Sequence, residues 1–334
     1  MKSKNKLIES YIFIAVVLLM LIGTIFLSIR IGAKNISIST IWESIVKYNP
    51  SNGQHIIIRT LRIPRVIVAL AVGGSFAVSG ALMQAITRNP MASPSVLGIN
   101  SGAALGLSIA MVVLPSASFN ETVMFSFGGA AVASLFIFGI SSISKSGSSP
   151  IRLALVGTAI TALFTSFSQA IAVYFNISQE LTFWNAGGIS GVRPEQALLI
   201  LPWTFIGLIL ALSISKSVTL LSLGEEVAVG LGGKIRYIKI IACIAVLILT
   251  GSSVAIVGPI GFVGLVVPHA VKFIVGVDYR RVIPFSIFAG ALLVLVSDII
   301  SRSINPPFET PIGAITALIG VPFFIYLATK KGRN

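Results

Sequence analysis

The sequence predicts an all-α polytopic membrane protein that crosses the bilayer about ten times. Hydrophobic residues make up 55% of the 334-residue chain and charged residues only 10%, and the mean hydropathy is +0.98. Soluble domains carry about a quarter charged residues, so this chain is too apolar to be one. Because a spanning helix needs about 20 apolar residues and apolar runs extend along the whole length, we expect a single transmembrane domain over residues 1–334.

Ten apolar runs, each bounded by turn residues or charges, are the predicted spans. They are Leu7–Ile29, Val66–Ile86, Val96–Leu114, Val123–Ile143, Leu153–Phe175, Ala197–Ile214, Ile238–Val257, Gly261–Val275, Val282–Ile300 and Ile312–Ala328. The first is too long for the apolar region of a signal peptide, so it is counted as a span. The third and eighth are short and interrupted by Gly and Pro, so we expect neighbouring helices to shield them. Small residues recur within the spans, as in Ala71–Ala81, and predict close contact between helix backbones.

The distribution of basic residues predicts the orientation. An even number of spans places both termini on one side, and the basic segments KSKNK and KKGRN identify that side as the cytoplasm. The gap over residues 30–65 breaks this rule, because it counts as external yet is basic. Its basic residues are Arg30, Lys34, Lys47, Arg59, Arg62 and Arg65. A miscounted helix, the stronger pull of the basic termini, or an external patch that receives an acidic partner would each explain it.

Several functions are excluded or disfavoured by composition. The net charge of +14 comes from basic residues scattered in short gaps, which is typical of topology signals and not of nucleic-acid binding. The single cysteine, Cys243, gives no disulfide framework or thiolate cluster. The two histidines, His55 and His269, are too few for a zinc cluster.

The chain also lacks an obvious energy source of its own. The segment GLGGKI resembles a phosphate-binding loop, but Ala228 replaces its first glycine and Ile235 replaces its Ser or Thr. Asp298 is the best candidate for an intramembrane proton relay. Arg302 lies four residues later on the same helical face, which favours a structural ion pair. We therefore expect the energy for any transport to come from something other than these groups.

Three stretches, together with the span count, resemble the FecCD-type permeases. They are RIPRVIVALAVGGSFAVSGALMQAITRNPMASPSVLGINSGAALG (Arg62–Gly106), LGEEVAVGLG (Leu223–Gly232), and GPIGFVGLVVPHAVKFIVGVDYRRVIPFSIFAGALLVLVSDIISR (Gly258–Arg302) with ETPIGAITALIGVPFFIYL (Glu309–Leu327). These permeases are membrane subunits of ATP-driven importers for ferric siderophores, haem and cobalamin. The likeness runs from about Leu61 to the C-terminus, and the motifs occur in the family's order.

The resemblance implies a translocation subunit of a bacterial cell membrane and not an enzyme. Its partners would be two cytoplasmic ATP-binding subunits, a second permease that is identical or paralogous, and an external substrate-binding lipoprotein. ATP and magnesium would bind the ATPase subunits, so this chain would bind no cofactor. A ferric siderophore would be the substrate, carried by alternating access, with haem and cobalamin as alternatives. An ion-gradient-driven secondary transporter is the alternative of a different class.

The resemblance also implies an ATPase-coupling segment within residues 216–236. Its residues are Leu223, Gly224, Glu225, Glu226, Val227, Ala228, Gly230, Leu231 and Gly232. The glycines would let the chain reverse between short helices, and the paired glutamates would lie in the first turn of one of them. A solvated acidic loop is the alternative, and the glutamates would either bind the ATPase or only begin a helix.

Two further sets of residues are assigned through the resemblance. Arg62, Arg65 and Arg302 match arginines that receive carboxylates of the binding protein, a role that suits the planar guanidinium. A cytoplasmic gate is expected at four positions, with ordinary turn chemistry as the alternative. These positions are Asn89, Met91, Ser149 and Pro150, of which Pro150 departs from the small hydroxyl residues common in the family.

Overall fold

The computed structural model describes residues 2–32, 35–142, 150–306 and 308–331, and over these residues the chain is helical with no strand. Seven helical segments are long and apolar enough to cross a membrane and three apolar helices are shorter, which confirms the ten predicted spans. The ten helices are α1 (Lys2–Arg30), α4 (Ile63–Thr87), α5 (Ile99–Val113), α6 (Phe119–Ser142), α7 (Pro150–Tyr174), α9 (Pro194–Ser213), α12 (Ile235–Val257), α13 (Val263–Val275), α14 (Tyr279–Ser303) and α15 (Ile312–Lys331).

Short helices connect these spans. They are α2 (Ile38–Val46), α3 (Gly53–Ile57), the π-helix η1 (Ile58–Arg62), the 3-10 helix η2 (Pro94–Leu97), α8 (Ser178–Ala186), α10 (Ser215–Ser222) and α11 (Glu225–Gly230). The sequence did not predict α2, α3 or α8, because helices this short have no long apolar run. Since α3 and η1 continue into α4, one helical segment extends over Gly53–Thr87, 35 residues.

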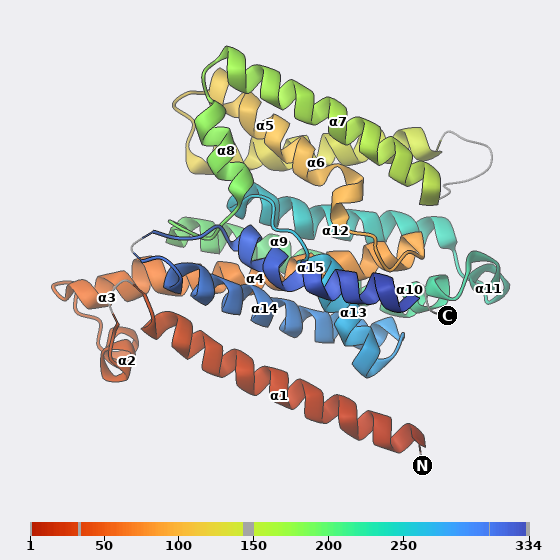
Figure 1. Ribbon diagram of the computed structural model, residues 1–334, viewed down its shortest axis with the longest axis horizontal. Coiled ribbons are helices and arrows are strands. Elements are labelled where there is room, and N and C mark those ends of the chain that lie inside the picture. Colours follow the sequence, from red (N-terminus) through yellow and green to blue (C-terminus); the bar gives the residue numbers. More distant parts are fainter. Residues whose placement is uncertain (1, 33–34, 143–149, 307, 332–334) are drawn as a thin grey trace.

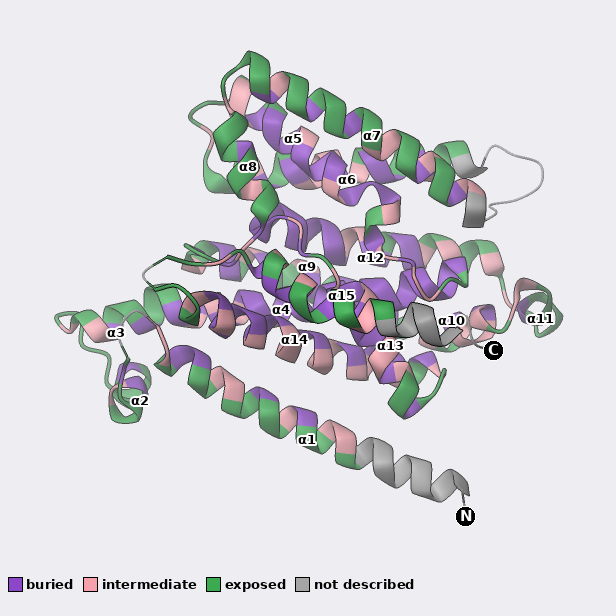
Figure 2. Cartoon of the chain, viewed as in Figure 1, coloured by how far each residue is buried: buried purple, intermediate pink, exposed green. Residues whose placement is uncertain are grey.

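Helix α4 lies at the centre of the bundle and packs against α9, α12, α13 and α14 (Figure 1). It is buried along almost its whole length (Figure 2). Its glycines allow this: a Cβ atom added at Gly73 would collide with the backbone of Gly290 in α14, and one added at Gly80 with Gly264 in α13. The close helix packing predicted from the small residues is therefore confirmed.

The two short spans are shielded by neighbouring helices, as predicted. Helix α5 packs against α6 and α7, and a Cβ atom added at Gly102 or Gly106 would meet the backbone of α6. Helix α13 contains Pro268 and packs against α4, α14 and α15. Both helices consequently bury much of their irregular backbone in protein.

The two ends of the bundle are formed by different elements (Figure 1). We call one end of the bundle the α11 end. Helix α1 begins there, helix α15 ends there, and the short helices α10 and α11 lie there (Figure 1). Helix α4 begins and α14 ends at the opposite end, which we call the Arg65 end (Figure 1). This arrangement agrees with an even number of crossings, while the cytoplasmic location of the α11 end stays a prediction.

The contact between α4 and α13 predicts that Gly80→Val destabilises the fold. The added side chain would overlap the backbone of Gly264, and overpacking costs about 1–3 kcal/mol or more. Gly128→Val is the matched control, because nothing lies within 4 Å of a Cβ atom added there. Thermal unfolding in detergent should show a lower Tm for Gly80→Val only. Equal Tm values for Gly80→Val and Gly128→Val would show that α4 and α13 can move apart without a measurable loss of stability.

Candidate functional site

An ion-pair cluster lies at the Arg65 end. Arg65 Nε donates to Asp298 Oδ1 at 2.9 Å, and its two terminal nitrogens donate to Glu309 Oε1 and Oε2 at 2.7 and 2.9 Å. Arg302 Nη2 lies 3.2 Å from Asp298 Oδ2, and the Asp298 side chain is completely buried. The predicted pairing of Asp298 with Arg302 is confirmed. Glu309, which clamps Arg65 bidentately, was missed by sequence reasoning because 244 residues separate the two.

The other two arginines of the cluster fasten α1 to the bundle. Arg302 Nη1 donates to the carbonyls of Ser28 and Ile31 at 3.2 and 3.0 Å. Arg62 Nη1 donates to the carbonyls of Ile29 and Arg30. These guanidinium groups donate hydrogen bonds to backbone carbonyl groups at the C-terminal end of α1, which have no partner within the helix.

The structure thus brings Arg62, Arg65 and Arg302 together, as a docking surface requires. Their side chains are occupied within the chain, however, and little of them is exposed: 12% for Arg65 and 7% for Arg302. Burial of Glu309 opposes its ionisation, but its hydrogen bonds with Arg65 outweigh this effect and hold the pKa of Glu309 below its usual value. Docking of a binding protein remains a prediction for these arginines.

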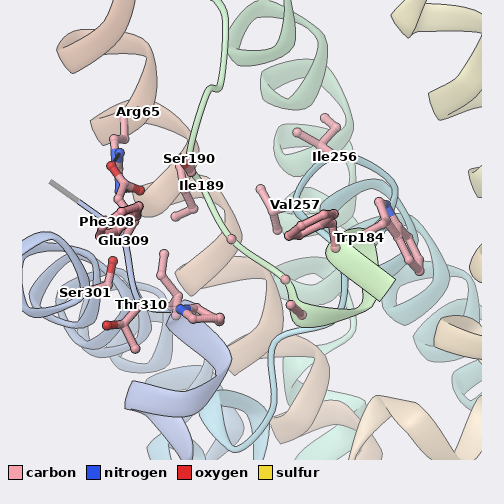
Figure 3. Close-up of a pocket in the computed structure, with 16 residues that line it drawn as sticks. Arg65, Trp184, Ile189, Ser190, Ile256, Val257, Ser301, Phe308, Glu309 and Thr310 are labelled. Atoms are coloured by element: carbon pink, nitrogen blue, oxygen red, sulfur yellow. Dashed lines mark hydrogen bonds and ion pairs between the residues drawn. The ribbon is translucent and has the colours of Figure 1, made fainter. Parts of the chain in front are cut away.

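A cavity of about 610 Å³ lies beside this cluster, within the usual size range of small-molecule sites, about 300–1,000 Å³. Figure 3 shows Arg65 and Glu309 on one side and Trp184 and Val257 on the other. The loop after α8 forms part of the wall, where Gly187 (φ +66) passes so close to Pro259 that a side chain would collide. The aromatic lining and the Arg65–Glu309 pair make this an amphipathic cavity.

At the α11 end, the predicted coupling segment consists of two short helices. Gly224 (φ +127) separates α10 from α11, and Gly232 (φ +78) turns the chain towards α12. Glu225 and Glu226 occupy the first turn of α11. The reversal at glycines and the placement of the glutamates are therefore confirmed, whereas binding of an ATPase stays a prediction.

The two glutamates have different surroundings. Glu225 Oε1 accepts a hydrogen bond from Lys239 Nζ of α12 at 2.8 Å and lies 3.7 Å from Arg88 Nη2, just after α4. Glu226 is exposed. Glu225 therefore ties α11 to the bundle although 36% of its side chain is exposed, whereas Glu226 lies on the surface.

The surface of the coupling segment is mainly apolar. Its exposed hydrophobic side chains are Leu223, Val227, Val229 and Leu231. Ala228 is buried, and Gly233 packs so tightly on its carbonyl that an added Cβ atom would lie 2.7 Å from it. The segment is thus a small apolar projection held in a fixed conformation.

Polar contacts link the coupling segment to the membrane helices. Thr219 Oγ1 in α10 accepts the backbone N–H of Tyr279 at 2.9 Å and lies 3.3 Å from Asp278 Oδ1. Hydrogen bonds from Arg280 hold the pKa of Asp278 below its usual value. These contacts join α10 to the first turn of α14.

A second polar contact joins α13 to α4 near the same end. Lys272 Nζ donates to Gln84 Oε1 at 2.8 Å and lies 5.0 Å from the centre of the Tyr279 ring. Gln84 Nε2 in turn donates to the carbonyls of Gly264 and Leu265. Intramembrane ionisable groups are expensive unless partnered and commonly mark functional positions. Sequence reasoning missed this pair, since Lys272 and Gln84 are 188 residues apart.

The expected gate is only partly described. Asn89 Oδ1 accepts the backbone N–H of Met91 at 2.9 Å, directly after Arg88 ends α4 with φ +49. This is an Asx turn, and a gating role for Asn89 and Met91 stays a prediction. Ser149 lies outside the described residues. Pro150 begins α7, and its side chain also lies outside them.

The described side chains offer no metal centre. In the part of the chain that the structure describes, no three His, Cys, Asp or Glu residues gather as a possible metal site. Cys243 is a free, buried thiol. Within the described residues, the candidate sites are an ion-pair cluster with an adjacent cavity at one end and an apolar projection at the other.

The ten apolar helices in the described part of the chain define a multi-pass membrane protein. The model of the FecCD transport family matches residues 18–330, and the chain belongs to this family. It is accordingly a permease subunit of the bacterial cell membrane and not an enzyme.

Relatives of known name are similar over nearly the whole chain. The iron(3+)-hydroxamate import system permease protein FhuB of Bacillus subtilis is 47% identical over 97% of this chain and 84% of its own length. The iron-uptake system permease protein FeuB of the same species is 46% identical over 92% of both chains. A solved structure, described as an inward-facing conformation of a metal-chelate-type ABC transporter, has a TM-score of 0.83 and 27% identity, covering 96% of this chain and 99% of its own.

The cluster predicts that Asp298→Asn is strongly destabilising. The substitution leaves Arg65 and Arg302 beside a neutral amide, and breaking a buried ion pair costs about 3–5 kcal/mol. Glu309→Gln is the control, because this carboxylate is 32% exposed and its loss should cost less. Thermal unfolding in detergent should give the lowest Tm for Asp298→Asn. A Tm equal to that of the wild type would refute the structural role of the pair.

The lowered pKa of Glu309 predicts a pH-dependent contribution to stability. A carboxylate whose folded pKa is depressed stabilises fully above its unfolded pKa of about 4.3 and loses this contribution as the pH falls through the folded pKa. The Tm difference between the wild type and Glu309→Gln should therefore be constant from pH 7 to about pH 5 and shrink below about pH 4. A difference that is unchanged at acidic pH would contradict the ion pair.

Proposed function

We propose that the chain is the permease of a binding-protein-dependent, ATP-driven importer for a ferric siderophore. The observation that carries this proposal is the identity of 47% and 46% with two iron-import permeases over more than nine-tenths of the chain. A chelated iron ion presents the organic surface of its chelator. A path for such a complex needs apolar and hydrogen-bonding walls and no metal ligands, which suits the amphipathic cavity beside Arg65.

We infer that the coupling segment docks on an ATPase through its apolar projection. Leu223, Val227 and Leu231 are exposed, and burying this apolar surface in a pocket of the partner would favour binding. Glu225 holds α11 by its bond with Lys239, whereas Glu226 remains available at the rim. In this proposal, one glutamate positions the projection and the other steers the partner.

A displacement of the ATPases would move α10 and, through it, α14, and so change the shape of the transport path. The bonds of Thr219 with the start of α14, and of Lys272 with Gln84 in α4, support such a route. Two permease copies would alternate between outward-facing and inward-facing states, with the turn at Asn89 and Met91 as part of the inner gate.

At the Arg65 end, carboxylates of the binding protein would meet the arginine cluster. Arg65 is the arginine best placed for this, because its partner Glu309 is itself partly exposed. An incoming carboxylate could exchange with Glu309 without uncovering Asp298. Arg62 and Arg302 would then contribute mainly positive potential, which speeds encounter more than it adds affinity.

The proposal predicts that Val227→Asp abolishes uptake of radioactive iron supplied as a ferric hydroxamate. A charge placed in the apolar contact should also prevent co-purification of the ATPase, since burying an unpaired carboxylate is costly. Membrane insertion and Tm should be retained, because Val227 is exposed.

Val277→Asp is the matched control for this experiment. It makes the same substitution at an exposed valine outside the coupling segment, between α13 and α14, and should keep most of the uptake. Normal co-purification and uptake in Val227→Asp would contradict the apolar coupling surface. Normal ATPase binding with uptake of haem or cobalamin in place of the ferric complex would leave the coupling intact and overturn the substrate assignment.

A further inference from the structure

Helix α2, in the segment between α1 and α3, has a composition that the transport mechanism does not explain. One face, with Ile41 and Ser44, is buried against the protein. A second face, with Ser39 and Glu43, is polar and exposed. A third face is exposed and entirely apolar, with the exposed fractions Ile38 64%, Trp42 66%, Ile45 50% and Val46 58%.

The three faces point in clearly different directions. At about 100° per residue, the centres of the buried, polar and apolar faces are separated from one another by roughly 95° or more. A helix between protein and water alone needs only two faces. Three faces require a third, apolar neighbour, and the boundary between membrane and water at the edge of a bundle provides it.

The tethers of α2 show that it lies across the bundle axis. Its start is held by the bond from Ile36 N to the carbonyl of Arg30 at 3.2 Å. Its end is held by Arg59, which donates to the carbonyls of Ser44 and Ile45 at 3.0 and 3.2 Å.

These two tethers are at nearly the same height along the bundle. Arg62, which precedes α4, binds the end of α1, and Arg59 lies only one turn further out, about 5 Å. Nine helical residues extend about 13 Å. Helix α2 therefore runs more nearly along the membrane surface than through it, beside the end of α1 at the Arg65 end (Figure 1).

Helix α2 contacts a helix whose own exposed apolar side chains would face lipid. Helix α1 is a spanning helix at the periphery of the bundle, and it contacts α2. Its side chains Leu19, Ile22 and Phe26 are exposed. Tryptophan is enriched where membrane meets water, because its ring is apolar and its N–H polar, and Trp42 lies in the middle of the α2 face.

We propose that α2 is an interfacial anchor whose apolar face lies in the lipid leaflet at the Arg65 end, with Trp42 at the boundary between head groups and acyl chains. The anchor fixes the depth of Arg59 and, through η1, of the arginine cluster. Phospholipid is thus the partner of this surface, and the binding protein meets only the polar face.

Depth-dependent fluorescence quenching tests the proposal. The chain has three tryptophans, so Trp184→Phe with Trp203→Phe leaves Trp42 as the only one. The permease is reconstituted into vesicles of phosphatidylcholine and phosphatidylglycerol. Quenching of the Trp42 emission should be strong when the phosphatidylcholine carries bromine close to its head group. Quenching should be weaker when the bromine is near the chain ends, and weakest with aqueous iodide.

The matched control moves the indole by one residue. In the same background, Trp42→Phe with Glu43→Trp turns it by about 100° towards the polar face, where iodide should quench it and brominated lipid should not. Strong iodide quenching of Trp42 without lipid quenching would overturn the proposal. Protection of Trp42 from iodide only after the loaded binding protein is added would overturn it as well.

A second measurement serves if the tryptophan-depleted chain does not insert. Cys243 is buried, so a spin label can be directed to Ile45→Cys in the otherwise native chain. Oxygen should relax this label more than a water-soluble nickel chelate does. The reverse order would place α2 in water and refute the anchor.

Discussion

The close backbone contacts of α4 with α13 and α14 hold the centre of the helix bundle together. In a bilayer, helices gain little from hiding apolar surface from lipid, so association relies on close packing. Gly73 and Gly80 let α4 approach Gly290 and Gly264 without intervening side chains. A helix held so closely along its length transmits displacement at one end to the other.

Each end of α4 carries polar groups that connect it to a different part of the molecule. Near its start, Arg65 joins α14 through Asp298 and the segment before α15 through Glu309. Near its end, Gln84 bonds Lys272 of α13, and Arg88 approaches Glu225 of the coupling segment. The proposed docking surface for a binding protein and the proposed contact with an ATPase are therefore connected by one packed helix.

Local signals in the sequence predicted much of this arrangement, but they did not predict the contacts between residues that are far apart in the chain. Hydropathy located the spans, small residues indicated close packing, and the spacing of Asp298 and Arg302 indicated their pair. The partner of Arg65 could not be inferred, because Glu309 approaches it only after the whole bundle has folded. Helix α2 was missed because its stability depends on tethers from Arg59 and Arg30 and not on an apolar run. The different surroundings of Glu225 and Glu226 likewise depend on Lys239, which reaches Glu225 across a chain reversal.

If the permease moves an iron chelate with energy delivered through the α11 end, transport must depend on ATP. This dependence can be measured as uptake of a radioactive ferric hydroxamate into proteoliposomes that contain the permease and its ATPase, with the loaded binding protein at the opposite face. We expect uptake that requires ATP on the ATPase side and continues when uncouplers collapse all ion gradients. Uptake that continues without ATP and stops with uncouplers would contradict it and identify a secondary transporter.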